Sequence, residues 1–138
     1  MEQQSDTLAS VFGNVIYAYT RADAITDGTL VDVSQLAREA GFRIPVAMTT
    51  GVWADCVEWT EADSQRQTQQ DEPGRLWDVL WMASLAARRA TGTRCPFQVY
   101  RIPRGGRSRR AKQTTLHLHI GPGDAGEPVI TILLPAED

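Results

Sequence analysis

Hydrophobic residues in the second half of the chain change from helical to strand spacing near residue 96. In residues 75–90 they form a broad apolar face at helical spacing, which predicts a long amphipathic helix. Residues 97–102, 114–120 and 129–134 are rich in β-branched and apolar residues, and 114–120 alternate cleanly. We therefore expect a helix followed by an antiparallel meander, with turn residues filling 121–128.

The first half of the chain predicts short elements. Residues 14–19 have the composition of a strand. Thr20, with Asp23 three positions later, is a helix N-cap signal, and Gly28 is a natural stop for that helix. Residues 30–33 form a short extended piece.

Two further helices are expected before the long one. A capped helix covers residues 35–40, and after an apolar bridge at 45–48 a second begins at Thr49 or Thr50. Residues 61–74 are acidic and rich in Gln and end in Pro-Gly, so we interpret them as a solvated loop or a frayed helix end. The fold class predicted is α+β: central helices packed on a C-terminal antiparallel meander, with a short N-terminal strand.

Length and composition set the class of protein. The 138 residues predict a flexible lead-in over 1–13 and a single α+β domain over 14–138. With 42% apolar residues and a net charge of −3, the chain is not wholly disordered, and no apolar run approaches the roughly 18 residues of a membrane span. Cys56 and Cys95 form no CxxC pair, and the polar start is unlike a signal peptide, so we expect a cytoplasmic protein.

A strongly basic segment, residues 101–112, joins two of the predicted strands. It contains no acidic residue and six basic ones, and removing their charge from the net −3 leaves −9 on the other 126 residues. Gly105, Gly106 and Ser108 predict a flexible tip. The candidate partner-binding residues are Arg101, Arg104, Arg107, Arg109, Arg110 and Lys112.

Three interpretations of this segment remain open. It can dock on an acidic protein or nucleoprotein, follow the phosphates of a nucleic acid, or merely keep a hairpin solvated. The acidic charge of the whole chain argues against a dedicated DNA-binding protein.

The sequence contains no recognisable catalytic constellation. His117 and His119 share one strand face, but no motif supplies the further ligands of a metal site, so a polar sheet face is the simpler interpretation. Cys56 fits a buried apolar position, and Cys95 has no general base nearby in sequence. We expect no cofactor, and a protein that is more simply explained as a binder than as an enzyme.

Four tryptophans lie in the helical middle of the chain. Trp77 and Trp81 are four residues apart and so share a helix face. We expect the tryptophans in the core; the alternative is an interface with a partner or a second copy, because tryptophan is enriched at binding hot spots.

Two stretches, residues 15–34 and 75–83, together with the turn of residues 121–124, resemble a family of small uncharacterised proteins encoded on bacterial plasmids, integrative elements and phages. The resemblance covers residues 14–135. The family has no established catalytic residues. The resemblance implies an accessory protein of a mobile element, whose neighbours often act in counter-defence by binding rather than by chemistry.

A second resemblance concerns only the N-terminal part. The strand with Tyr17 and Tyr19, followed by Thr20 and a short helix, is similar to the opening of ADP-ribosyltransferase folds. That family carries a His or Arg in this strand, whereas here Arg21 falls just after it and no downstream catalytic Glu is identifiable. This resemblance implies Tyr17, Tyr19 and Arg21 as candidate nucleotide-binding residues.

The leading hypothesis is a non-catalytic counter-defence protein that binds a host protein or nucleoprotein complex through the basic segment. The alternatives are an ADP-ribosyltransferase-like or signalling-nucleotide-binding protein, and a nucleic-acid-binding protein.

Overall fold

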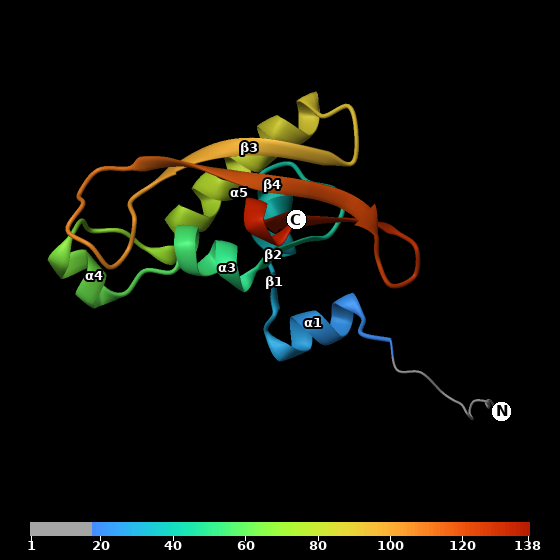
Figure 1. Ribbon diagram of the computed structural model, residues 1–138, viewed down its shortest axis with the longest axis horizontal. Helices are drawn as coiled ribbons and strands as arrows, with labels where there is room; N and C mark the ends of the chain where they lie inside the picture. The colour runs from blue at the N-terminus through green and yellow to red at the C-terminus, as the bar shows by residue number, and fades with distance from the viewer. Residues whose placement is uncertain (1–17) are drawn as a thin grey trace.

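The computed structural model describes residues 18–138, and the predicted lead-in lies outside them. So does most of the predicted N-terminal strand, of which residues 18 and 19 have no strand structure. The described chain forms an α+β fold, with helices beside a sheet (Figure 1). The sheet is mixed and has five strands in the order β1-β2-β5-β4-β3. The strands are β1 (Leu30–Asp32), β2 (Val46–Thr49), β3 (Arg94–Arg101), β4 (Lys112–Pro122) and β5 (Pro128–Leu133).

Helices occupy the segments between the strands and flank the sheet. They are α1 (Arg21–Asp27), α2 (Ser34–Glu39), α3 (Thr50–Val52), α4 (Glu61–Arg66) and α5 (Glu72–Arg89), with a π-helical turn η1 (Trp53–Val57) and a C-terminal 3₁₀ turn η2 (Pro135–Glu137).

The predicted antiparallel meander is confirmed. Strand β3 pairs with β4 from Arg94 opposite His119 to Arg101 opposite Lys112, and β4 pairs with β5. The alternation in β4 buries Leu116 and Leu118 completely and leaves the intervening residues partly exposed. Because successive side chains of a strand point to opposite faces, one face of the meander is apolar and the other polar.

The sheet is larger than the sequence pattern predicted. The prediction that residues 45–48 only bridge two other elements is wrong. Val46–Thr49 form strand β2, which pairs parallel with β5 and antiparallel with β1. All three residues from Val46 to Met48 are buried. A strand covered on both faces has a continuous apolar sequence without alternation, so its periodicity does not distinguish it from a linker.

The N-terminal helix signals are confirmed. Thr20 and Asp23 form a reciprocal capping box at the start of α1, and Gly28 ends the helix at φ 87°. Such a left-handed conformation is accessible to glycine without a steric penalty. Thr49 caps α3, whose last turn widens into η1.

Residues 61–74 are neither the solvated loop nor the frayed helix end that were expected, because they contain one capped helix and the start of another. Thr60 and Asp63 form a second capping box that begins α4. Asp71 then accepts the N–H of Gly74 at the start of α5, which begins at Glu72, three residues before the predicted start. Pro73 is tolerated there because the first turn of a helix needs no N–H from it.

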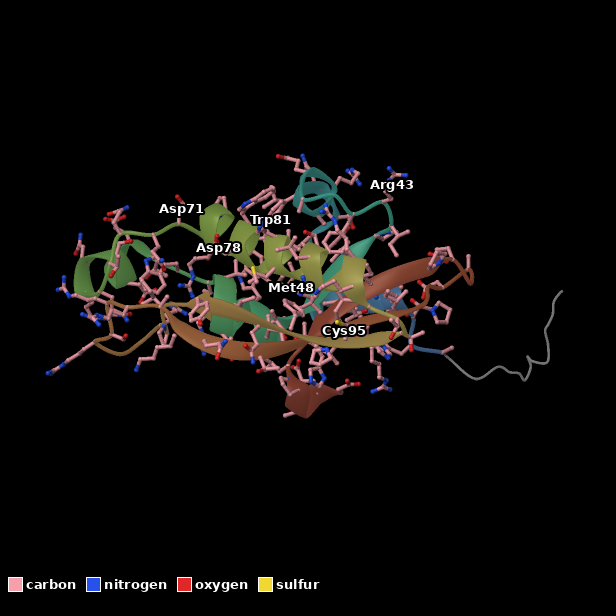
Figure 2. The ribbon with its side chains drawn as sticks, turned by 90° about the horizontal axis from the view of Figure 1, so that it is seen from above. Arg43, Met48, Asp71, Asp78, Trp81 and Cys95 are labelled. Atoms are coloured by element: carbon pink, nitrogen blue, oxygen red, sulfur yellow. The ribbon has the colours of Figure 1, made fainter. Side chains whose placement is uncertain are left out.

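Helix α5 covers the apolar face of the sheet, and the C-terminal end of the chain lies on the opposite face (Figure 2). The core side of α5 is formed by Val79, Leu80 and Ala83, each at most 1% exposed. Trp77 and Trp81 stack with their ring centroids 5.9 Å apart, as expected, but Trp81 is 41% exposed. The prediction of a tryptophan core is therefore wrong for Trp81, because the buried stripe of the helix runs through the smaller aliphatic residues.

Candidate functional site

The basic segment forms the loop between β3 and β4, which extends beside α4 (Figure 1). Its first two arginines form ion pairs with residues of η1, α4 and the segment between them. Arg101 contacts both carboxylate oxygens of Asp55 through Nη2, at 3.1 and 3.2 Å. Arg104 bonds Asp63 through Nε at 2.6 Å and Glu58 through Nη1 at 3.0 Å. Arg101 and Arg104 therefore each have a carboxylate partner within the chain, and their role in binding a partner stays a prediction.

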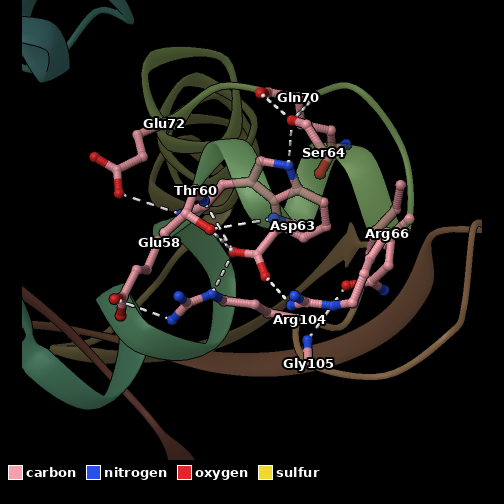
Figure 3. A network of polar contacts seen from close by, with 12 residues as sticks. Glu58, Thr60, Asp63, Ser64, Arg66, Gln70, Glu72, Arg104 and Gly105 are labelled. Carbon is pink, nitrogen blue, oxygen red and sulfur yellow. Dashed lines mark hydrogen bonds and ion pairs between the residues drawn. The ribbon is translucent and has the colours of Figure 1, made fainter.

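Asp63 is the centre of the network that holds the loop (Figure 3). Its side chain is 2% exposed and accepts hydrogen bonds from the backbone N–H and hydroxyl of Thr60 and from Arg66 and Arg104. The hydrogen bond from Arg104, with those from Thr60, lowers the pKa of Asp63 to about 2 although burial acts in the opposite direction. The carboxylate is therefore charged throughout the physiological range.

Gln67, buried at 2% exposure, fixes the backbone of the loop. Its Nε2 donates to the carbonyls of Pro103 and Ser108, at 2.8 and 2.7 Å, and its Oε1 accepts the N–H of Gly105. One side chain thus joins both arms of the loop. Gln67 therefore bonds the backbone on both sides of Gly106, and the flexibility of the tip stays a prediction.

The side chains of the remaining four basic residues take no part in this network (Figure 3). Their side chains are exposed, and none makes an ion pair with residues 18–138. The loop therefore presents four positive charges that have no ion-pair partner among residues 18–138, on a backbone that Gln67 bonds at residues 103, 105 and 108. We call these residues the outer basic surface: Arg107, Arg109, Arg110 and Lys112.

The histidine pair lies on the polar face of β4, as its spacing predicted. His117 Nδ1 is 2.8 Å from Asp138 Oδ2, and the same carboxyl group bonds Arg94. These contacts lower the pKa of Asp138, with the His117 hydrogen bond as the largest cause. Residues 18–138 contain no group of three or more His, Cys, Asp or Glu side chains able to hold a metal ion.

Cys56 is fully buried, as predicted. Burial, with the neighbouring Asp55 carboxylate, raises the pKa of its thiol to about 12. A thiol with this pKa is protonated at neutral pH and is a poor nucleophile.

Two of the three candidate nucleotide-binding residues, Tyr19 and Arg21, lie among the described residues and make contacts within the chain. Tyr17 lies outside the described residues. The hydroxyl of Tyr19 donates a hydrogen bond to Asp27 at 2.5 Å. The guanidinium group of Arg21 donates to the carbonyl of Ile130 and to the hydroxyl of Thr131, both at 2.7 Å. Arg21 thereby fastens α1 to β5, and the nucleotide hypothesis stays a prediction.

Arg75 is a structural centre that the sequence analysis missed. It is 4% exposed, donates to the carbonyls of Val57 and Ile102 and to Gln70 Oε1, and lies 4.4 Å from the ring centroid of Trp59. Its position in the apolar helix pattern is the only local sign of burial. For the Asp63 network a local signal did exist, the Thr60–Asp63 capping box.

Comparison with known proteins gives a family and no activity. A model of a family of unknown function, DUF6573, matches residues 9–138. The chain belongs to this family. No curated protein and no solved structure matches the chain. Among the described residues no helix is long and apolar enough to cross a membrane.

Proposed function

We propose that this member of the DUF6573 family is a binding protein that docks an acidic macromolecular partner, a protein or a nucleoprotein, on the outer basic surface. The observation that carries this proposal is that the basic residues of one loop divide into two groups. Arg104 forms ion pairs with Asp63 and Glu58, whereas the four residues of the outer basic surface make no ion pair with the described chain.

Preorganisation supports the same proposal. A mobile loop loses conformational entropy when it becomes ordered on a partner, and this cost lowers the affinity for the partner. Here Gln67 and Asp63, both buried, hold the loop before any partner arrives. A buried polar network of this kind is more than a solvated hairpin needs, since a loop that only promotes solubility gains nothing from a fixed conformation.

The rest of the chain is acidic, with −9 outside the 101–112 segment. This negative charge would repel the parts of a nucleic acid that extend past the loop, because each phosphate is negative as well. A protein partner can instead present an acidic patch only where it contacts the loop. We therefore place an acidic protein surface, free or within a nucleoprotein, before bare nucleic acid. A role in counter-defence for a mobile genetic element is part of this proposal and rests on the sequence resemblance alone.

The test is capture of partners from host lysate, with and without nuclease, using two variants of equal charge. The first is Arg107→Glu, Arg109→Glu and Arg110→Glu in the outer basic surface. The second reverses three exposed arginines elsewhere: Arg38, Arg43 and Arg89. We expect a partner that survives nuclease, is retained by the control variant and is lost by the loop variant.

Other outcomes contradict the proposal in distinct ways. A partner retained by the loop variant excludes the outer basic surface as the contact. A partner lost with nuclease, with an affinity that falls by roughly one logarithmic unit per phosphate contact for each tenfold rise in salt, indicates nucleic acid instead.

A further inference from the structure

A small cavity of about 100 Å³ lies where α5 and η1 meet the foot of the basic loop. Arg75 and Arg101 both line it, together with Asp78, Tyr100 and Ala111. One water needs roughly 10–15 Å³ of such space, so the cavity has room for several waters or one small polyatomic ion.

Each of the two arginines keeps one donor without a partner. Arg75 Nη2 and Arg101 Nε are buried and have no hydrogen-bond acceptor within residues 18–138. The other donor nitrogens of the two guanidinium groups are engaged. Those of Arg75 bond Val57, Gln70 and Ile102, and those of Arg101 bond Asp55 and the carbonyl of Lys112. Buried donors without an acceptor are rare in folded proteins, and two of them beside one cavity point to an acceptor that the chain itself does not supply.

We propose that this cavity is a carboxylate-binding site, in which one carboxylate group accepts hydrogen bonds from Arg75 and Arg101. Guanidinium groups match the geometry of carboxylate and phosphate oxygens. The charges around the cavity decide between these two anions. Arg75 and Arg101 are balanced formally by Asp55 and Asp78, so a dianionic phosphate adds two uncompensated charges and a carboxylate only one.

Two of the residues that line the cavity are exposed: Tyr100, at 63%, and Ala111. They lie at the end of β3 and just before β4, so a ligand would enter from the side of the basic loop. Arg110 and Lys112 flank Ala111 in the chain and belong to the outer basic surface, so their positive charge raises the local concentration of anions at the opening. The carboxylate is either a free small molecule or an acidic side chain of the proposed partner.

The experiment is a titration of the isolated ¹⁵N-labelled protein with sodium acetate, followed by the amide signals of Tyr100 and Ala111 and the Nε–H signal of Arg75. Sodium chloride at equal ionic strength is the control. We expect saturable shifts with acetate and none with chloride. A linear response, or equal responses to both salts, shows a water-filled cavity and overturns the proposal. Tighter binding of phosphate than of acetate overturns the assignment to carboxylate.

Two variants test the residues. Arg101→Gln should weaken acetate binding by about tenfold, as expected for the loss of a charge-assisted hydrogen bond, whereas Arg43→Gln, which removes the same charge from an exposed position outside the basic loop, should retain it. Asp78→Asn keeps both arginines and removes a negative charge from the lining, so it should tighten binding several-fold. Equal affinities in Arg101→Gln and the unaltered protein, or no tightening in Asp78→Asn, contradict the site.

A blocked tripeptide containing one glutamate distinguishes the two sources of the carboxylate, a free small molecule and an acidic side chain of the partner. Binding of the tripeptide with the same dependence on Arg101 supports a site that receives a partner's side chain. Binding of acetate alone supports a site for a free carboxylate. Because no partner is present in these titrations, the site can fail while the outer basic surface still binds its partner, and the reverse.

Discussion

Arg104 and Asp63 are 41 residues apart in sequence, and their side chains meet at 2.6 Å between Nε and Oδ2. This contact joins the loop between β3 and β4 to α4. The basic segment therefore has two roles. Arg104 stabilises the loop, and the loop presents the outer basic surface.

Asp63 makes the stability of the protein sensitive to acid. The pKa of Asp63 is about 2 in the folded protein, below its ordinary value of 3.8. The stabilisation from the charged carboxylate is therefore complete above the ordinary value and is lost as the pH falls from there through about 2. We expect Asp63→Asn to lower the urea midpoint of unfolding at pH 6, with the difference from the unaltered protein narrowing toward pH 2. Glu61→Gln, in an exposed position of the same helix, is the control, and an equal loss in both variants would contradict this role of Asp63.

Gln67 controls the order of the loop. Gln67→Ala removes three hydrogen bonds and leaves two carbonyl groups without their donor, so we expect a loss of about 1–3 kcal/mol in the free energy of unfolding. Hydrogen exchange should accelerate in residues 103–110 and stay unchanged in β5. Gln69→Ala, at an exposed position two residues away, should change neither. Unchanged exchange in the loop of Gln67→Ala would show that other contacts hold it.

Two adjacent glycines in the loop should respond differently to the same substitution. Gly105 has φ 90°, whereas Gly106 has no left-handed conformation, and a Cβ at either position meets no atom within 4 Å. We expect Gly105→Ala to cost about 1 kcal/mol of stability and Gly106→Ala almost nothing, because only the first forces an L-residue into the left-handed region. Chemical denaturation of the two variants measures the difference, and equal costs would be inconsistent with this backbone conformation.

The two cysteines should differ in reactivity. Burial and Asp55 raise the pKa of Cys56 to about 12, whereas Cys95 is partly exposed. At pH 8 an aromatic disulfide reagent should therefore modify one thiol in the native protein and both in denaturant, because the thiolate is the reactive form. The variant Cys95→Ser should show no native reaction, and rapid labelling of Cys56 in that variant would contradict the burial of η1.

The parts of the fold that depend on neighbours in sequence were predictable. The capping pair Thr20 and Asp23 lies within one helical turn, and the alternation around Leu116 and Leu118 identifies the buried face of β4. The same kind of local signal at Thr60 and Asp63 predicts α4, but the acidic, Gln-rich composition of the segment led to a different interpretation.

The candidate site was predictable only as a run of charge. Sequence identifies six basic residues in one segment, but the carboxylates that pair with Arg101 and Arg104 come from η1, from the residue after it and from α4. They are Asp55, Glu58 and Asp63. The pattern of charges along a chain does not show which distant residues they pair with. The sequence therefore could not show that Arg104 is paired within the chain and that Arg107 is not.

By itself, therefore, the sequence determined the fold class, the meander, most helix boundaries and the position of the basic loop, because capping, turn formation and periodicity act over a few residues. Only the tertiary structure decided that β2 lies beside β5, that Gln67 closes the loop, and that Arg75 and Arg101 meet at one cavity. These relationships depend on which buried surfaces and unpaired polar groups find each other when the chain packs, and that choice is made among residues far apart in sequence.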